Sequence, residues 1–422
     1  MEISRLRRAT ALALGFALVG GTGVFAGTLT VRPGVPSVGG VARYTGTHGL
    51  EVDVATPDRN PAYVQSSHPV AESVYRLRFF VNLRGLTMTN GNEFDIFAAS
   101  DGADPTPPAT TGNVLFRAVA RQTAGKKVLS AFVRTDLGSE VEIPSEVILA
   151  DGWRMLEVDW AKSTAGGTGT GNGHFTLWVD GVQKANLASL DNDNGTINYA
   201  RLGAVNGVDA ATSGTAKFDD FASQRTGYIG VIQLFSDVPT SYAFFKYVQG
   251  LYASEITSGC AVGQFCPAGN VSREQMAVFL VRAAHGATFV PPAATGIFSD
   301  VSLANFTAPY IEQLYNDGVT SGCATSPLRY CPSDPVTRAQ MAVFLLRAEH
   351  GSGYTPPPAT GIFSDVAADF TRPFIEQLYN EAVTSGCATD PLRYCPVDAV
   401  SRGQMAVFLL RTFSLPPQEI GP

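Results

Sequence analysis

The chain has 422 residues and a formal net charge of −7 at pH 7, with 43 glycines and 26 prolines. This length exceeds one ordinary hydrophobic core, so we expect two or more domains. The acidic balance argues against nucleic acid as a partner, because phosphate binding needs a basic face and no cluster of lysine and arginine follows the first residues.

The N-terminal end has the layout of a secretory signal. Arginines within the first eight residues precede an apolar run at 9–19, and small residues lead up to Ala26. We therefore expect a signal peptide at 1–26, cleaved after Ala26, and a secreted protein. A membrane anchor is the alternative, but this run is too short to cross about 30 Å of hydrocarbon, so we expect no transmembrane segment after cleavage. The C-terminal end shows neither a hydrophobic tail nor a sorting motif, so retention at a surface would be non-covalent.

The region 27–228 reads as a β-sandwich. Apolar and polar residues alternate at 75–81, 155–160 and 174–179, and Asn-Gly and Asp-Gly pairs separate such segments. Alternation with a period of two is typical of half-buried strands, and these dipeptides mark turns. Many strands without a helical stretch predict two packed sheets.

Two motifs in this region resemble a known fold. Leu177-Trp178-Val179-Asp180-Gly181-Val182, with Phe218-Asp219-Asp220-Phe221 closing the region, resembles the concanavalin A-like or laminin-G-like jelly roll. The resemblance implies a sandwich with a glycan or protein ligand, although the fold hosts lectins, enzymes and spacers alike.

An enzyme is the alternative for the sandwich. Glu93-Phe94-Asp95-Ile96-Phe97 resembles the start of the Glu-x-Asp-x-x-Glu strand of jelly-roll glucanases, whose paired carboxylates lie about 5–5.5 Å apart. The position of the last glutamate holds Ala98. Because the acid/base partner is missing, we expect no enzymatic activity.

A polar run at 191–195, Asp-Asn-Asp-Asn-Gly, offers oxygen ligands that calcium prefers. A run that ends in Asn-Gly is also typical of a hairpin turn, and we favour that interpretation. We therefore expect no metal and no cofactor.

The C-terminal half is repetitive. Phe-Ser-Asp-Val occurs at 235–238, 298–301 and 363–366, and each copy continues with an apolar helix, Ser-Gly-Cys, an aromatic-Cys-Pro step and a second helix. Such a period indicates repeats that bury their apolar faces against one another. We expect three repeats, at 234–290, 297–355 and 362–413.

The second helix of each repeat has a readable start. A hydroxyl residue is followed three positions later by glutamine, which predicts a capping box, and valine before the cap with methionine at the fourth helical position predicts a hydrophobic staple. The run Met-Ala-Val-Phe-Leu that follows is apolar on all sides, so this helix should be buried. Three such helices are expected around a pseudo-threefold axis. The capping pairs are Ser272/Gln275, Thr337/Gln340 and Ser401/Gln404.

All six cysteines lie in these repeats, one pair in each. The recurrence of the pair favours local disulfides in an exported protein. Zinc is the rival, but no histidine or further cysteine stands at ligand spacing. The expected disulfides are Cys260–Cys266, Cys323–Cys331 and Cys387–Cys395.

The order of these motifs resembles the S-layer homology family. That resemblance implies a three-pronged domain that binds an anionic secondary polymer of the cell wall or a peptidoglycan-linked glycan. The family's Thr-Arg-Ala-Glu turn corresponds to 272–275, 337–340 and 401–404, with glutamine in place of the glutamate. Its usual tryptophan in the first helix is absent, with Phe244, Tyr310 and Phe374 nearby.

The resemblance makes the arginines of these turns the expected polymer contacts. Each stands at the first helical position, where free N–H groups and the helix dipole favour an anion. As an alternative, each arginine lies at a solvated helix start or forms an ion pair with the aspartate of Phe-Ser-Asp-Val. In a simpler interpretation, that aspartate only caps a turn. The candidate site residues are Arg273, Arg338, Arg402, Asp237, Asp300 and Asp365.

Together these features predict a secreted protein of the cell surface or envelope, anchored to the wall by its repeats and displaying the sandwich. Two alternatives stay open: a surface glycan hydrolase, and a purely structural envelope protein in which the sandwich is a spacer.

Overall fold

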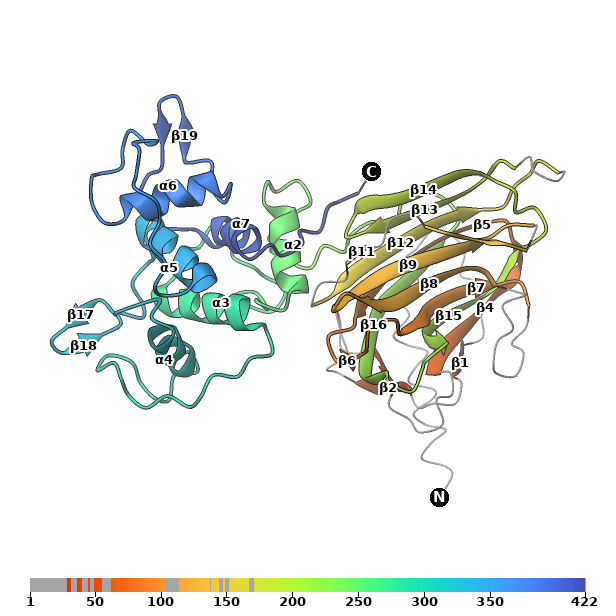
Figure 1. Ribbon diagram of the computed structural model, residues 1–422, viewed down its shortest axis with the longest axis horizontal. Coiled ribbons are helices and arrows are strands. Elements are labelled where there is room, and N and C mark those ends of the chain that lie inside the picture. Colours follow the sequence, from red (N-terminus) through yellow and green to blue (C-terminus); the bar gives the residue numbers. More distant parts are fainter. Residues whose placement is uncertain are drawn as a thin grey trace, which may run out of the picture. The chain divides into compact units, whose positions relative to one another are not determined.

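The computed structural model describes residues 29–31, 36–39, 45, 49–54, 62–102, 114–136, 138–143, 147–148, 152–166 and 171–421. The expected signal peptide at 1–26 lies outside these residues. The chain divides into two compact units, Met1–Ile232 with Gln418–Pro422, and Gln233–Pro417 (Figure 1).

The first unit is a sandwich of two antiparallel sheets, each with eight strands among the described residues. One sheet has the strand order β1 (Leu29–Val31), β4 (Ala62–Glu72), β15 (Ile197–Asn206), β7 (Glu93–Ser100), β8 (Val114–Thr123), β9 (Lys126–Arg134) and β10 (Glu140–Glu142), with β11 (Val147–Ile148) also paired to β9. The other has the order β14 (Val182–Leu190), β13 (Gly173–Val179), β12 (Arg154–Ala161), β5 (Val74–Asn82), β16 (Ser213–Gln224), β3 (Gly49–Asp53) and β2 (Pro36–Gly39), with β6 (Leu86–Thr87) paired to β16. The predicted two-sheet sandwich is therefore confirmed.

The core of the sandwich contains a cluster of aromatic rings. Phe116 lies 5.5 Å from Phe175 and 6.3 Å from Trp160 between ring centroids, and all three side chains are buried. These residues come from both sheets, so their contacts hold the layers together. Such rings prefer edge and offset geometries and contribute beyond their buried area.

One turn differs from the sequence interpretation. The run at 191–195 connects β14 to β15, and these strands belong to different sheets, so Asn194-Gly195 is not a hairpin turn. The Asp136 carboxylate instead accepts the backbone N–H groups of Asp193 (2.7 Å) and Asn194 (3.0 Å) and fixes the connection. Asp180-Gly181 does join neighbouring strands, β13 and β14, with positive φ at both residues as a type I′ turn requires.

The second unit contains three pairs of helices. The first helix of each repeat is short: α2 (Phe245–Ala253), α4 (Ala308–Asn316) and α6 (Arg372–Asn380). The second is the buried one: α3 (Arg273–His285), α5 (Arg338–His350) and α7 (Arg402–Thr412). Small hairpins, β17–β18 (Ala324–Thr325, Leu328–Arg329) and β19–β20 (Ala388–Thr389, Leu392–Arg393), follow α4 and α6. No helix in the described ranges has the length and apolar character that crossing a membrane requires.

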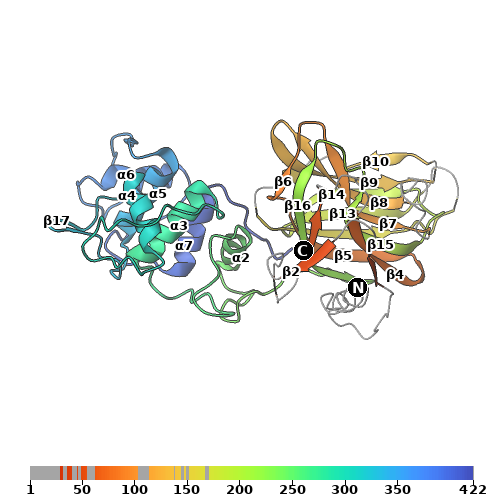
Figure 2. The same cartoon turned by 90° about the horizontal axis from the view of Figure 1, so that it is seen from below.

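The helices α3, α5 and α7 contact one another and lie side by side in both views (Figures 1 and 2). All three predicted capping boxes are present, which explains where these helices begin. Around their starts, three valines form a closed ring of backbone hydrogen bonds. Val271 N–H donates to Val400 O (2.9 Å), Val336 N–H to Val271 O (2.9 Å) and Val400 N–H to Val336 O (3.0 Å). The expected pseudo-threefold arrangement is confirmed.

Candidate functional site

The start of each long helix meets the aromatic-Cys-Pro step of the next repeat in a cyclic order. We call these three contacts seams and name each by its arginine. The Arg273 seam joins the first repeat to the second, the Arg338 seam joins the second to the third, and the Arg402 seam joins the third back to the first.

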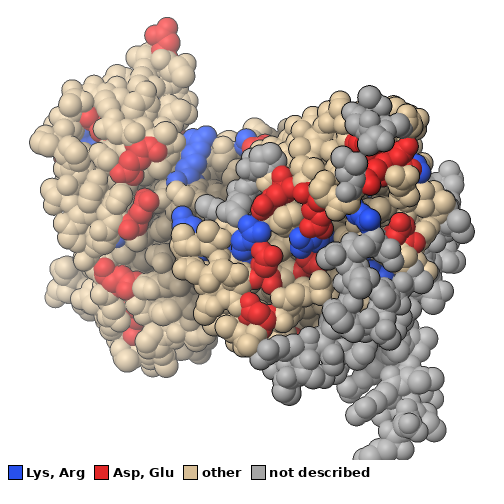
Figure 3. Space-filling model, turned by 45° about the vertical axis from the view of Figure 1, so that its right-hand side comes forward, with Lys and Arg blue, Asp and Glu red and all other residues tan. Residues whose placement is uncertain are grey.

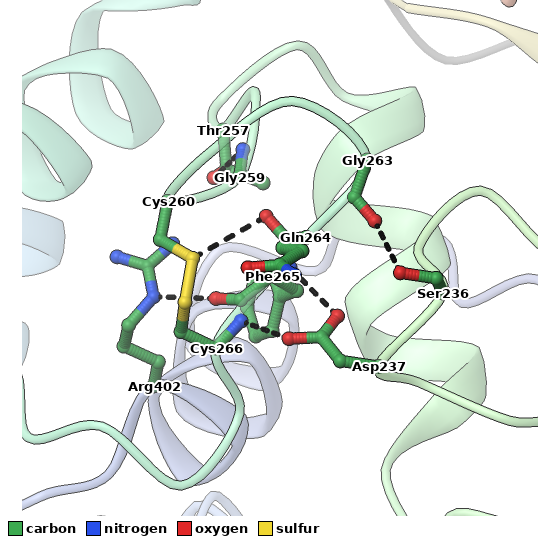
Figure 4. Close-up of a disulfide and its surroundings, with 10 residues drawn as sticks. All are labelled: Ser236, Asp237, Thr257, Gly259, Cys260, Gly263, Gln264, Phe265, Cys266 and Arg402. Carbon is green, nitrogen blue, oxygen red and sulfur yellow. Dashed lines mark hydrogen bonds between the residues drawn. A yellow bond between two sulfur atoms is a disulfide. The ribbon is translucent and has the colours of Figure 1, made fainter.

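Each seam arginine is buried and binds a main-chain oxygen across the seam. The Nε atoms donate at 2.7 Å to the carbonyls of Tyr330, Tyr394 and Phe265, respectively. Arg402 lies in this way beside the Cys260–Cys266 disulfide (Figure 4). Each guanidinium also lies over the ring of that same aromatic residue, at 4.6 to 4.9 Å from the centroid. The arginines are therefore structural braces between repeats.

The helix starts are not open to an anion, contrary to our expectation. At the Arg273 seam the N–H of Arg273 donates to Asp334 O (2.9 Å), and the N–H of Glu274 donates to Pro332 O (3.0 Å). The next N–H is taken by the capping hydroxyl of Ser272. The backbone N–H groups of Arg273 and Glu274 are thus hydrogen-bonded to carbonyl oxygens of the neighbouring repeat. One Nη nitrogen of Arg273, Arg338 and Arg402, however, is buried without a hydrogen-bond partner in the described parts of the chain.

The three aspartates cap the turn that carries the accepting carbonyl. Asp237 accepts the backbone N–H groups of Phe265 (2.9 Å) and Cys266 (2.7 Å) (Figure 4). Asp300 and Asp365 make the same pair of bonds in their repeats, all at 2.8 Å. Burial alone would raise the pKa of Asp300 and Asp365, but these N–H groups and a nearby arginine lower the pKa overall. Among the described ion pairs, none joins a seam arginine to one of the three aspartates. Asp300 pairs with Arg329 and Asp365 pairs with Arg393.

The six cysteines form disulfides within the repeats: Cys260–Cys266, Cys323–Cys331 and Cys387–Cys395. Each disulfide closes the loop that ends in the aromatic-Cys-Pro step. Asp300 and Asp365 lie beside two of these disulfides, but oxidised cysteines offer no thiolate to zinc.

The carboxylates that suggested a glucanase lie on β7 and are paired across the sheet. Asp95 binds Arg117 (2.8 Å) and Glu93 binds Arg121 (2.7 Å), both arginines coming from β8. Figure 3 shows acidic and basic side chains next to one another over the sandwich, rather than in separate fields. Burial raises the pKa of Asp95, although Arg117 opposes the shift.

The polar run at 191–195 contributes to an acidic cluster. Carboxylate oxygens of Asp136, Asp191 and Asp193 lie within 4.8 Å of one another. The Asp136 carboxylate already accepts two backbone N–H groups, so its oxygens are partly occupied by hydrogen bonds that stabilise the loop. The arrangement could hold a cation such as calcium, which prefers oxygen ligands, but the same contacts explain it as a braced loop.

Comparison with known proteins decides the identity of the first repeat. Residues 234–277 match the family model of the S-layer homology (SLH) domain. The chain carries an SLH domain. This domain indicates association with the cell surface. A 123-residue stretch is 30% identical to an endoglucanase of Bacillus sp. (strain KSM-635), covering 29% of this chain but only 12% of the length of that relative.

Solved structures are similar over about half of the chain. The botulinum neurotoxin serotype G binding domain matches with a TM-score of 0.33 and 11% identity, over 49% of this chain and 45% of that chain. The alginate lyase Aly36B matches with a TM-score of 0.32 and 16% identity, over 46% and 88%. The cellulose-induced protein Cip1 matches with a TM-score of 0.32 and 17% identity, over 47% and 86%.

Sequence reasoning missed two exposed aromatic residues in the second and third repeats. Phe306 and Phe370, just before α4 and α6, are 75% and 73% exposed. Phe306 lies at the Arg273 seam, because its neighbours Asn305 and Thr307 bind the Glu274 carboxylate at 3.0 and 3.2 Å. The recurring Phe-Thr-x-Pro motif was the available signal.

The aromatic residues we had noted in the first helices have another role. Tyr310 and Phe374 lie beneath Arg282 and Arg347, at 5.6 and 5.7 Å from ring centroid to guanidinium carbon. These arginines come from the long helix of the preceding repeat, so the contacts form a second set of braces between repeats.

The Arg402 seam differs from the other two. The residue after the arginine is Glu274 or Ala339 in the first two seams but Gly403 in the third. A Cβ atom on Gly403 would lie 2.2 Å from the hydroxyl of Tyr242, so a larger residue would require that side chain to move. The Arg402 seam is thus covered by half-buried Tyr242 and Phe244, where the other repeats present an exposed phenylalanine.

Proposed function

We propose that this protein is exported and held at the cell surface by its SLH repeats, which bind an anionic polymer of the cell wall and leave the sandwich displayed. The SLH match carries the proposal. The three disulfides support it, because such bonds persist in oxidising surroundings outside the cell.

The seams supply the chemistry for an acidic sugar. Each seam arginine uses Nε to hold the repeats together, and one of its Nη nitrogens has no hydrogen-bond partner among the described residues. A carboxylate is a strong acceptor for such a nitrogen. Because this nitrogen is buried, the polymer must displace side chains that cover the seam. Phe306 and Phe370 stand exposed in two repeats, where an apolar sugar face could pack.

Having three seams should strengthen binding even if each seam binds the polymer weakly. Three seams on one folded unit raise the effective concentration for a polymer that engages more than one of them. Arg273, Arg338 and Arg402 therefore act together in this proposal, with Asp237, Asp300 and Asp365 fixing the turns that they bind.

The exposed phenylalanines give the cleanest test, because their truncation leaves the braces intact. We expect the double variant Phe306→Ala/Phe370→Ala to bind purified cell walls about tenfold more weakly in a sedimentation assay, about 1.4 kcal/mol. Val290→Ala is the matched control, since Val290 is 83% exposed at the end of the first repeat. Equal sedimentation of the double variant and the control would contradict the proposed contact.

We infer display rather than catalysis for the sandwich. Glu93 and Asp95 are held by arginines, and Ala98 stands where a glucanase would need its second glutamate. The match to an endoglucanase keeps hydrolysis as the second candidate. A reducing-sugar assay with β-glucans should show no product, and release of reducing ends would establish the hydrolase.

A further inference from the structure

The C-terminal ends of α5 and α6 bring one histidine and two glutamates together. Glu349 and His350 are the last two residues of α5, and Glu381 directly follows α6. The Nε2 atom of His350 lies 3.1 Å from an oxygen of Glu381 and 3.9 Å from an oxygen of Glu349. One nitrogen or oxygen atom of each side chain lies within 4.8 Å of the other two. The second and third repeats thus share one cluster, at the opposite end of α5 from the Arg338 seam.

The surroundings of this cluster favour a cation. Neither carboxylate forms an ion pair with a lysine or arginine among the described residues, whose ion pairs join both carboxylates to His350 alone. The partial negative charge at the C-terminal ends of two helices adds to that of the carboxylates. Burial raises the pKa of Glu349, and the nearby Glu381 carboxylate raises it further, although His350 opposes the shift. A divalent cation would relieve the repulsion between the two glutamates.

Two neighbouring side chains hold the cluster in place. The ring of Tyr354 lies 4.4 Å from the ring of His350 between centroids. The Gln377 side chain donates from Nε2 to an oxygen of Glu381 at 2.8 Å. Outer contacts of this kind orient the side chains that bind a metal. The three side chains of the cluster are 24 to 33% exposed, so an ion can reach them from solvent.

The first and second repeats meet in the same way, with one carboxylate fewer. His285, at the end of α3, lies 2.8 Å from an oxygen of Asp317, which directly follows α4. The residue before His285 is Ala284, where the later junction has Glu349. The two junctions therefore share a histidine and one acid, and they differ in the third side chain.

We propose that Glu349, His350 and Glu381 form a binding site for a divalent transition-metal ion such as zinc. Imidazole nitrogen and carboxylate oxygen are zinc ligands, whereas calcium prefers oxygen ligands alone. Zinc ligands lie about 2.0–2.2 Å from the metal and so about 3.3 Å from one another in a tetrahedron, which is close to the separations found here. The metal takes the lone pair of Nε2, and a proton held there passes to solvent. The ion joins the second repeat to the third, and the site does not depend on wall anchoring.

The test uses the full chain with its disulfides intact, so that no thiolate competes for the metal. Calorimetric titration of zinc chloride into protein freed of metal by a chelator should show binding. Glu349→Ala reduces the cluster to the two side chains of the first junction and should weaken zinc binding at least tenfold. His285→Gln is the matched control, because it removes the corresponding histidine of the first junction, and it should bind zinc like wild type.

A second variant adds a ligand and covers the case in which Glu349→Ala does not fold. Ala284→Glu gives the first junction its missing carboxylate, so this variant should bind one more zinc ion per chain than wild type. Calcium chloride at the same concentration should not displace zinc, which distinguishes the site from exposed acidic groups. The proposal is overturned if wild type does not bind zinc, if calcium displaces it, if folded Glu349→Ala binds like wild type, if His285→Gln weakens binding as much as Glu349→Ala, or if folded Ala284→Glu binds no additional zinc.

Discussion

Arg402 donates from Nε to the main-chain oxygen of Phe265, 137 positions earlier in the chain, and so closes the ring of three repeats. The equivalent bonds of Arg273 and Arg338 span 57 and 56 positions. Because every repeat both gives and receives such a bond, the helical unit should unfold as one cooperative structure rather than repeat by repeat.

Removing one brace should therefore destabilise the whole helical unit. Arg338→Ala loses a charged hydrogen bond and leaves the carbonyl of Tyr394 unpaired, so we expect a loss of about 2–4 kcal/mol in the free energy of unfolding. Urea unfolding followed by far-ultraviolet circular dichroism reports this unit, because its helices dominate the signal. Arg393→Ala is the control, with an exposed arginine, and should cost under about 0.5 kcal/mol. Equal costs would show that the seam bond contributes little.

The same urea assay should show a larger loss of stability for a change in the core than for a change in a helix cap. Phe344→Ala removes a buried ring that also contacts the Arg273 guanidinium at 5.5 Å, and should cost about 3–5 kcal/mol. Thr337→Ala removes only the side chain that caps the helix and should cost about 0.5–2 kcal/mol. If Phe344→Ala leaves the stability unchanged, the account in which α3, α5 and α7 form the buried centre of the helical unit is wrong.

Acid should weaken the helical unit through two buried glutamates. Glu312 accepts the backbone N–H groups of Thr295, Gly296 and Ile297, and Glu376 does the same in the third repeat. Burial alone would raise the pKa of each carboxyl, but these bonds lower the pKa overall. The unfolded state then binds more protons. The stabilisation is complete above the ordinary glutamate pKa of about 4.3 and is lost as pH falls through the lower folded pKa.

The measurement is the urea midpoint of the helical unit between neutral and acid pH. Glu312→Gln should flatten its fall in acid, and the first repeat already holds Gln249 at the equivalent position. Asp390→Asn, at an exposed hairpin turn, should leave the profile unchanged. An unaltered profile in the glutamine variant would contradict the assignment.

Reduction should weaken the repeats but not the sandwich, because all six cysteines lie in the helical unit and all three tryptophans in the sandwich. Each closed loop contributes roughly 2–3 kcal/mol in the loop-entropy account. Peptide mapping without reduction should recover the pairs 260/266, 323/331 and 387/395. A pair between repeats, or a shift of the tryptophan fluorescence transition on reduction, would be inconsistent with the structure.

Local features were predictable because their determinants are close in sequence. The capping box of Thr337 and Gln340 lies within four residues, and the strands at 75–81, 155–160 and 174–179 are marked by simple alternation. The function of Arg273 was not predictable in this way. Its partner Tyr330 lies in another repeat, and only the closed ring brings that carbonyl to the start of the helix.

The sequence pattern also did not predict which aromatic side chains are exposed. Tyr310 and Phe306 are both aromatic and four positions apart, yet one lies beneath Arg282 while the other projects into solvent. The run ending in Asn194-Gly195 misled for a related reason: its turn chemistry is local, but whether the flanking strands pair depends on the sheet that each one joins.

The central claim is that the SLH repeats hold the protein on an anionic wall polymer, and sedimentation with purified cell walls tests it most directly. The full chain should pellet with intact walls and remain soluble with walls from which the secondary polymer has been extracted by hydrofluoric acid. Added salt should weaken the first result, because ionic contacts are screened. Equal pelleting with both wall preparations, or none with either, would contradict the account.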